Sequence, residues 1–311
     1  MKEKELQKLI SYLEKKGYQI HNFLKWGNEL PPYPLFKEIL FPPCETLLKY
    51  NHTKQEEVLD KTKRVLLGVN PLDLKALNLW YQVFEKDPYW QTKIKNTIII
   101  GTSLMNFKRE EKKEQGFAME IFEENTLEHL HFDIFLAGEA KDYKVFTGSE
   151  KGQEVLDKFK YKNYEHVDFM GPVREEGMDE QILKIRAKLK NRYIEKIWQK
   201  YGKKCIECGK CTYVCPTCFC FDLEDQPELP KGKGKKVRTW SSCLFPSFSE
   251  VAGGHKFQEE TAKRLYFWYY HKFVRIPEEF NMPGCVGCGR CAKACPVGID
   301  IKKVLDDILK S

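Results

Sequence analysis

Residues 205–221 read "CIECGKCTYVCPTCFCF" and contain six of the twelve cysteines in this chain of 311 residues. Residues 285–300, "CVGCGRCAKACPVGID", repeat the spacing of the first four. Both runs follow C-x2-C-x2-C-x3-C-P, the bacterial ferredoxin spacing in which the fourth cysteine ligates the other of two [4Fe–4S] clusters. The pattern therefore predicts two clusters with exchanged ligands: cluster I at Cys205, Cys208, Cys211 and Cys295, and cluster II at Cys285, Cys288, Cys291 and Cys215.

The spacing has a physical basis. Three thiolates two residues apart wrap one corner of a cubane, and Gly209, Gly287 and Gly289 let backbone N–H groups approach the sulfur atoms. The fourth cysteine lies one turn further on, is followed by proline and points toward the other cluster, so the two runs must be adjacent in space. Structural zinc, the alternative, needs four ligands per site and gives no reason for a repeated Cys-Pro ending.

Three further cysteines, Cys218, Cys220 and Cys243, lie outside this pattern. They could supply ligands of another cluster, completed by His255, His271 or another chain. They could also be small buried side chains around cluster I, because free cysteine is among the most buried residue types. No complete ligand set is visible, which favours the second interpretation. Both histidines are expected to pack beside aromatic residues with hydrogen bonds to the backbone.

Composition limits the class of protein. The chain is 42% hydrophobic and 31% charged, which is ordinary for a folded globular protein, and its length fits about two domains. No apolar run approaches the roughly 18 residues of a membrane span, and the charged N-terminus does not resemble a secretory signal. We therefore expect a cytoplasmic protein with reduced thiols, in which patterned cysteines bind metal rather than form disulfides.

The net charge of +7 does not indicate a nucleic-acid partner. Basic residues alternate with acidic ones along the expected helices, which is typical of a solvated face, and no nucleic-acid-binding motif accompanies them. There is also no phosphate-binding loop, dinucleotide fingerprint or nucleophile elbow. No catalytic residue is predicted, and any bond-making step is expected on a partner chain.

The predicted fold class is α+β, with an α/β docking domain over residues 1–175 and a mostly helical, two-cluster ferredoxin-like domain over residues 176–311. Apolar runs at 64–70 and 96–103 predict buried strands on either side of a helix, the signature of a parallel layer. A strand pair is expected at 132–138 and 144–149. Helices are expected at 2–16, 179–200, 257–272 and 300–310, and the aromatic residues 266–270 are expected to shield the clusters from water.

Several segments, in this order, resemble a known family: "CGKCTYVCPTCFCFD", "RTWSSC", "VAGGHKF", "YYHKF" and "GCVGCGRCAKACPVGIDI". They are similar to the iron–sulfur β subunit of soluble nickel–iron hydrogenases (sulfhydrogenases) and to the related iron–sulfur subunit of anaerobic sulfite reductase. The resemblance is dense in the C-terminal half and extends more weakly to residues 66–90 and 96–103. It implies a non-catalytic electron-relay subunit of an anaerobic oxidoreductase complex.

The resemblance also implies partners. They are a flavin- and NAD(P)H-binding subunit on one side and the small and large subunits of a NiFe hydrogenase on the other. The same relay could serve a siroheme-containing sulfite or sulfur reductase instead. A different class, an iron–sulfur redox sensor, would need a nucleic-acid-binding element, and none is legible.

The chain departs from the family in its N-terminal half. Relatives commonly have a cysteine where Leu72 stands here, and a cysteine cluster after the strand that matches residues 96–103. Residues 104–122, "LMNFKREEKKEQGFAMEIF", contain no cysteine. The resemblance therefore implies that any third cluster of relatives is absent from this domain.

Overall fold

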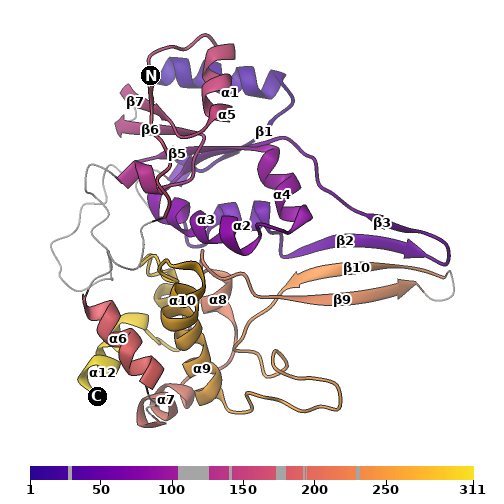
Figure 1. Ribbon diagram of the computed structural model, residues 1–311, viewed down its shortest axis with the longest axis vertical. Helices are drawn as coiled ribbons and strands as arrows, with labels where there is room; N and C mark the ends of the chain where they lie inside the picture. Colours follow the sequence, from indigo (N-terminus) through magenta and orange to yellow (C-terminus); the bar gives the residue numbers. More distant parts are fainter. Residues whose placement is uncertain are drawn as a thin grey trace.

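The computed structural model describes residues 1–26, 30–103, 126–139, 142–172, 180–191, 193, 195–228 and 232–311. The predicted cysteine-free segment 104–122 lies outside these residues. The architecture is α+β, as expected: helices and two β-sheets alternate in the first half of the chain, and helices dominate the second (Figure 1). Among the described residues, no helix is long and apolar enough to cross a membrane.

A six-stranded sheet organises the first half, in the order β1-β4-β5-β6-β7-β8. Its strands are β1 (Gln19–Asn22), β4 (Arg64–Val69), β5 (Thr97–Thr102), β6 (Ile134–Glu139), β7 (Asp142–Thr147) and β8 (Glu165–His166). β1, β4, β5 and β6 are parallel neighbours, whereas β6 and β7 form an antiparallel pair. The two predicted buried strands and the predicted strand pair are thus confirmed, and near-continuous apolar runs are what a parallel sheet covered on both faces requires.

Helices cover both faces of this sheet (Figure 1). α1 (Glu3–Lys15) and α5 (Glu150–Lys158) lie on one face, where Leu9 packs with Val65 and Leu67. α2 (Leu35–Leu40), α3 (Pro71–Val83) and α4 (Pro88–Lys95) lie on the other, where Leu66 packs with aromatic side chains such as Trp80. The alternation of Val65, Leu66 and Leu67 between the two cores follows from the period of two along a strand.

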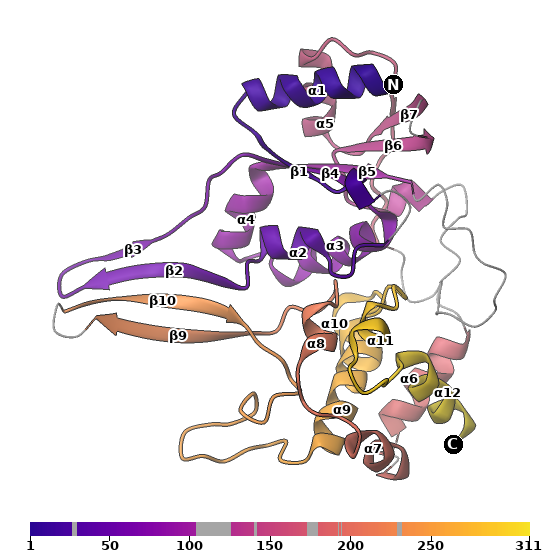
Figure 2. The same cartoon turned by 180° about the vertical axis from the view of Figure 1, so that it is seen from behind.

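A second sheet of four strands projects from the body as an arm (Figure 2). Its order is β3-β2-β10-β9, with β2 (Cys44–Asn51), β3 (Gln55–Glu57), β9 (Phe221–Glu228) and β10 (Lys233–Trp240), and all neighbours are antiparallel. One hairpin comes from each side of residue 175. The sequence patterns did not predict this arm.

The rest of the second half is helical. It contains α6 (Glu180–Asn191), α7 (Glu195–Gly202), α8 (Lys210–Tyr213), α9 (Thr261–Tyr270), a π-helical segment (His271–Arg275), α10 (Ile276–Phe280), α11 (Arg290–Ala294) and α12 (Ile301–Lys310). The single helix predicted at 179–200 is wrong, because the structure has two helices there. α6 packs mainly against α12 and the π-helical segment, whereas α7 packs mainly against α9. The helices predicted at 257–272 and 300–310 are present.

Candidate iron–sulfur centres

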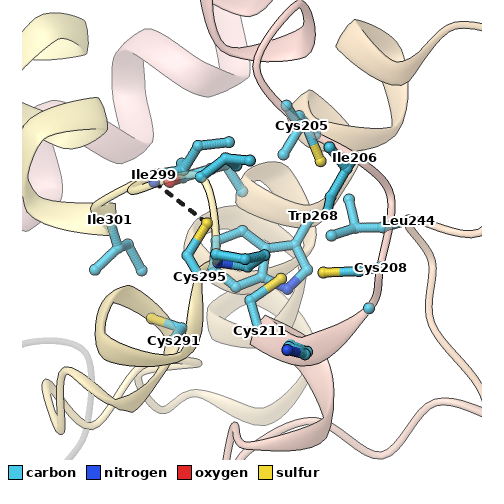
Figure 3. Close-up of a pocket in the computed structure, with 16 residues that line it drawn as sticks. Cys205, Ile206, Cys208, Cys211, Leu244, Trp268, Cys291, Cys295, Ile299 and Ile301 are labelled. Carbon is cyan, nitrogen blue, oxygen red and sulfur yellow. Dashed lines mark hydrogen bonds between the residues drawn. The ribbon is translucent and has the colours of Figure 1, made fainter.

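Four cysteines from both runs surround one cavity, which we call site I: Cys205, Cys208, Cys211 and Cys295. Figure 3 shows their sulfur atoms around this cavity, with Cys291 also at its edge. The first three cysteines come from the loop between α7 and α8 and from α8 itself, and Cys295 follows α11. The predicted exchange of the fourth ligand thus corresponds to residues that the fold brings together.

The walls of this cavity are apolar. Leu244, Trp268, Tyr269 and Ile299 line it, and Trp268 and Tyr269 are buried. Of the aromatic residues 266–270, which were predicted to shield the clusters, these two lie at the cavity, whereas Phe267 is 36% exposed and lies outside the lining. Such walls exclude water from a cluster and lower the local dielectric, which tunes its potential.

Part of the cavity's rim is open to solvent. Ile206 is 59% exposed and Val297 is 36% exposed, and both line the cavity. Cys208 is also exposed. Site I therefore lies near the surface of the chain.

Backbone N–H groups point at the sulfur atoms. Glu207 N donates to Cys205 Sγ at 3.4 Å, and Ile299 N donates to Cys295 Sγ at 3.2 Å. The first loop places Glu207 at a φ of 58°, a left-handed conformation that Gly287 adopts at the matching position of the second run with a φ of 68°. A left-handed residue other than glycine is costly. The Glu207 carboxylate compensates by accepting hydrogen bonds from Arg264 and Thr261.

The second group of thiols, which we call site II, consists of Cys285, Cys288, Cys291 and Cys215. The negative charges of its members act on one another: Cys215 and Cys285 both raise the pKa of the Cys291 thiol, after the larger effect of burial. Burial also raises the pKa of the Cys288 thiol to about 12, despite the nearby Arg290 guanidinium. The isolated thiols of Cys288 and Cys291 would stay protonated, so a metal that binds them as thiolates must displace protons.

The two runs are joined at site II by direct hydrogen bonds. Thr217 Oγ1 donates to the carbonyl oxygen of Gly284 at 2.8 Å, and it lies 3.2 Å from Cys215 Sγ. The Lys272 ammonium donates to Cys215 Sγ at 3.2 Å and to the Gly284 oxygen at 3.0 Å. The run that contains Cys215 is thereby held against the residue that precedes Cys285.

Two buried ammonium groups near these thiols differ in their surroundings. Lys37 donates to the carbonyl oxygens of Thr212, Tyr213 and Cys215 at 3.2 to 3.4 Å. Burial lowers the pKa of Lys37, and the neighbouring cysteines oppose this only in part. Burial acts in the same direction on Lys272, but the thiolates of Cys215 and Cys285 outweigh it, so that the pKa of Lys272 lies above its usual range.

The N-terminal half of the chain contacts site II directly. Arg290, the first residue of α11, donates to both carboxylate oxygens of Asp73 on α3, at 2.5 and 2.9 Å, and from Nε to the carbonyl oxygen of Pro31. Trp80 Nε1 donates to the carbonyl oxygen of Pro216 at 2.6 Å. Both members of the Arg290–Asp73 pair are buried. Because Arg290 lies between Cys288 and Cys291, this pair fixes the second cysteine loop to α3.

Three of the four remaining cysteines gather beside α8, whereas Cys44 is exposed at the start of β2. Cys218 and Cys243 are buried and Cys220 is half-buried, and the Cys220 thiol interacts with both of the others. His271 lies between the rings of Phe219 and Phe267. The expectation that His255 is packed is wrong: it is exposed in the loop after Val251, and its ring meets the exposed Phe257 ring edge to face. Neither histidine joins the three thiols.

The donor set of site I fits an iron–sulfur cluster. Within the described ranges, no group of three or more His, Cys, Asp or Glu side chains is gathered closely enough to hold one metal ion. The four thiols of site I instead surround a cavity with apolar walls and backbone donors, which is the environment of a thiolate-ligated cubane.

The charged residues of these sites were not predicted from the sequence. Lys272 follows the aromatic run, Arg290 stands inside the second cysteine run, and Asp73 is 217 positions before Arg290. Only their positions in the sequence could have drawn attention to them. Arg290 lies within the second cysteine run, and Asp73 directly follows Leu72, where relatives commonly have a cysteine. Contacts over such separations require the fold.

Comparisons with known proteins agree with this description. Residues 204–299 match the family model of the 4Fe-4S dicluster domain. The chain is 33% identical over 299 residues to sulfhydrogenase 2 subunit beta of Pyrococcus furiosus, covering 90% of this chain and 83% of that protein. It is 22% identical over 303 residues to the F420-dependent formate dehydrogenase subunit beta of Methanocaldococcus jannaschii, covering 89% and 72%.

A shorter match is to the Hdr-like menaquinol oxidoreductase iron-sulfur subunit 2 of Archaeoglobus fulgidus. It is 26% identical over 105 residues, which is 32% of this chain and 16% of that protein. No solved structure matches the chain.

Proposed function

The chain belongs to the family of sulfhydrogenase β subunits, and we propose that it relays electrons through two [4Fe–4S] clusters within a multi-subunit oxidoreductase. Site I and site II hold one cluster each. The observation that supports this proposal is the proximity of cysteines from different runs, as an exchange of ligands requires: Cys295 lies at the cavity of Cys205, and Cys215 lies near Cys285. Such an exchange places two clusters side by side, as a relay requires.

Bound clusters of this kind take up and release single electrons. The chain's own residues would hold them at a fixed separation, exclude water and stabilise their charge. Trp268 and Tyr269 close the inner wall of site I, and the exposed rim at Ile206 and Val297 gives a partner short access to it. Site II is covered by residues of the N-terminal half.

The proposed partners follow from the family. They are a flavin- and NAD(P)H-binding subunit, and the small and large subunits of a NiFe hydrogenase. Residues 1–175 would serve as the docking domain and residues 176–311 as the two-cluster domain. The relatives named for formate dehydrogenase and menaquinol oxidoreductase indicate that the same design serves other electron carriers, so the donor must be identified by experiment.

The first test is anaerobic purification from the native host. We expect iron and inorganic sulfide equivalent to two cubanes per chain, and copurification with a flavoprotein and a nickel protein. Copurification with a siroheme protein would assign the relay to a sulfite or sulfur reductase instead. A colourless protein that contains zinc would refute the relay.

The ligand exchange is tested by Cys295→Ser. This change should alter the magnetic resonance signal of the cluster held by Cys205, Cys208 and Cys211, although Cys295 lies in the other run. Cys215→Ser is the matched variant and should alter the other signal. If each variant instead disturbs the cluster of its own run, the assignment is wrong.

A further inference from the structure

Lys272 is a buried ammonium in contact with a cysteine of site II. It lies in the π-helical segment between α9 and α10 and is 5% exposed. Its three donors are all used: Nζ lies 3.2 Å from Cys215 Sγ, 2.9 Å from Thr217 Oγ1 and 3.0 Å from the Gly284 oxygen. π-helical turns are rare and frequently occur at functional sites.

This ammonium lacks a carboxylate partner. Within the part of the chain that the structure describes, no ion pair joins Lys272 to an aspartate or glutamate, and its other neighbour is the ring of Trp268. A buried charge without a counter-charge is strongly unfavourable, so such groups are normally paired. The group within reach that can become anionic is the sulfur of Cys215, 3.2 Å from Nζ, which binds a cluster as a thiolate. The fold therefore keeps a positive charge at site II that only an anionic centre there can balance.

Of the other buried charges near the two sites, two are paired with an opposite charge, and the Lys37 ammonium donates to carbonyl oxygens rather than to sulfur. The Arg290 guanidinium, also near site II, is neutralised by Asp73. At site I, the Glu207 carboxylate beside Cys205 is paired with Arg264. The sulfur atoms of site I receive hydrogen bonds from the uncharged backbone N–H groups of Glu207 and Ile299. The unbalanced positive charge thus belongs to site II.

We propose that Lys272 raises the reduction potential of the cluster at site II, so that this cluster has the higher potential of the two. The proposal rests on the proposed function and its ligand assignment. Reduction adds one negative charge to a cluster. A cation in contact with a ligand sulfur, in a site of low dielectric, stabilises the reduced state more than the oxidised one. Electrons would then reside preferentially on the cluster beneath the N-terminal half.

The test is a potentiometric titration of the purified, cluster-loaded protein, followed by electron paramagnetic resonance. In the wild type we expect two one-electron steps. Lys272→Met should lower the reduction potential of the higher step. At a fixed potential the ratio of reduced to oxidised cluster should fall about tenfold or more, which corresponds to about 59 mV for a one-electron couple. The lower step should stay in place and the iron content should stay unchanged. If Lys272→Met loses iron, Lys272→Gln, which keeps a donor but no charge, carries the same test.

Two further variants separate charge from structure. Lys272→Arg keeps the charge and should restore most of the potential. Lys37→Met removes a buried ammonium that donates to carbonyl oxygens and not to sulfur, and it should shift the potential less than Lys272→Met. The proposal is overturned if the higher step does not move, if the lower step moves instead, or if Lys272→Arg behaves as Lys272→Met. Absence of two clusters from the wild type would overturn the proposed function as well, whereas two clusters with unmoved potentials would overturn this inference alone.

Discussion

The Arg290–Asp73 pair should decide whether site II survives, and Asp73→Asn tests this. The change preserves the shape of the side chain but leaves the Arg290 guanidinium buried without a counter-charge. The Arg290 side chain is 1% exposed and the Asp73 side chain is 5% exposed, so solvent cannot replace the lost partner. Breaking a buried pair by removing one member costs about 3–5 kcal/mol, which is a large part of the 5–15 kcal/mol, roughly, that stabilises a typical domain.

The assay is anaerobic denaturant unfolding of the loaded protein, monitored by circular dichroism and by visible absorbance of the clusters. The midpoint should fall markedly for Asp73→Asn, and a chelator should remove iron from site II before site I. Glu154→Gln, which breaks the exposed pair with Lys158, is the matched control and should change stability by less than about 0.5 kcal/mol. The double variant Asp73→Leu with Arg290→Leu should be more stable than Asp73→Asn, because it leaves no buried charge. If the free energy of unfolding of Asp73→Asn lies within about 1 kcal/mol of the wild-type value, the pair does not hold the second cysteine loop in the way that its burial indicates.

Two other outcomes are expected. Cys218→Ala should leave the iron content at that of two cubanes, because the thiol lies outside sites I and II and Cys220 and Cys243 are its neighbours; loss of iron beyond two cubanes, measured by metal analysis, would reveal an additional site. Burial lowers the pKa of His131 to about 4 between the rings of Tyr81 and Phe169, so the folded state prefers the neutral imidazole. The unfolded chain binds the proton at an ordinary pKa near 6.5, and wild-type stability should therefore fall as the pH drops from about 6.5 to about 4, by up to roughly 3 kcal/mol. His131→Phe should remove this part of the pH dependence. If the free energy of unfolding of the variant falls as steeply between pH 6.5 and 4 as that of the wild type, the assignment is contradicted.

The sequence predicted those helices and strands whose apolar residues follow a regular local pattern. The apolar runs of β4 and β5 bury both faces, and the apolar stripe of α1 puts Leu6, Leu9 and Leu13 into one core. The cysteine spacing predicted an exchange of ligands between the two runs, and Cys295 lies at the same cavity as Cys205, Cys208 and Cys211. These features depend on short-range periodicity, which a single sequence displays directly.

The arm could not be predicted in this way. β9 is acidic, contains Pro227 and is exposed along nearly its whole length, and β10 begins with a run of lysine and glycine. Neither strand has the β-branched, half-buried pattern that indicates a sheet. What stabilises them is pairing within the sheet: β10 pairs with β2, from the other half of the chain, and β9 pairs with β10. The ion pairs of Arg238 with Glu45 and Asp87 stabilise the base of this arm in the same way.

The same dependence on distant residues gives the two sites different surroundings. The cavity of site I is built by residues 205–301 alone, and its rim reaches solvent. Site II takes hydrogen bonds and charge from Lys37, Asp73 and Trp80, which all belong to the first half of the chain. A change in the first half should therefore alter site II while leaving site I intact, and a partner that binds the first half lies nearest to site II. A relay needs one site for electrons to enter and another for them to leave. Among the described residues, site I and site II differ because the N-terminal half packs against site II.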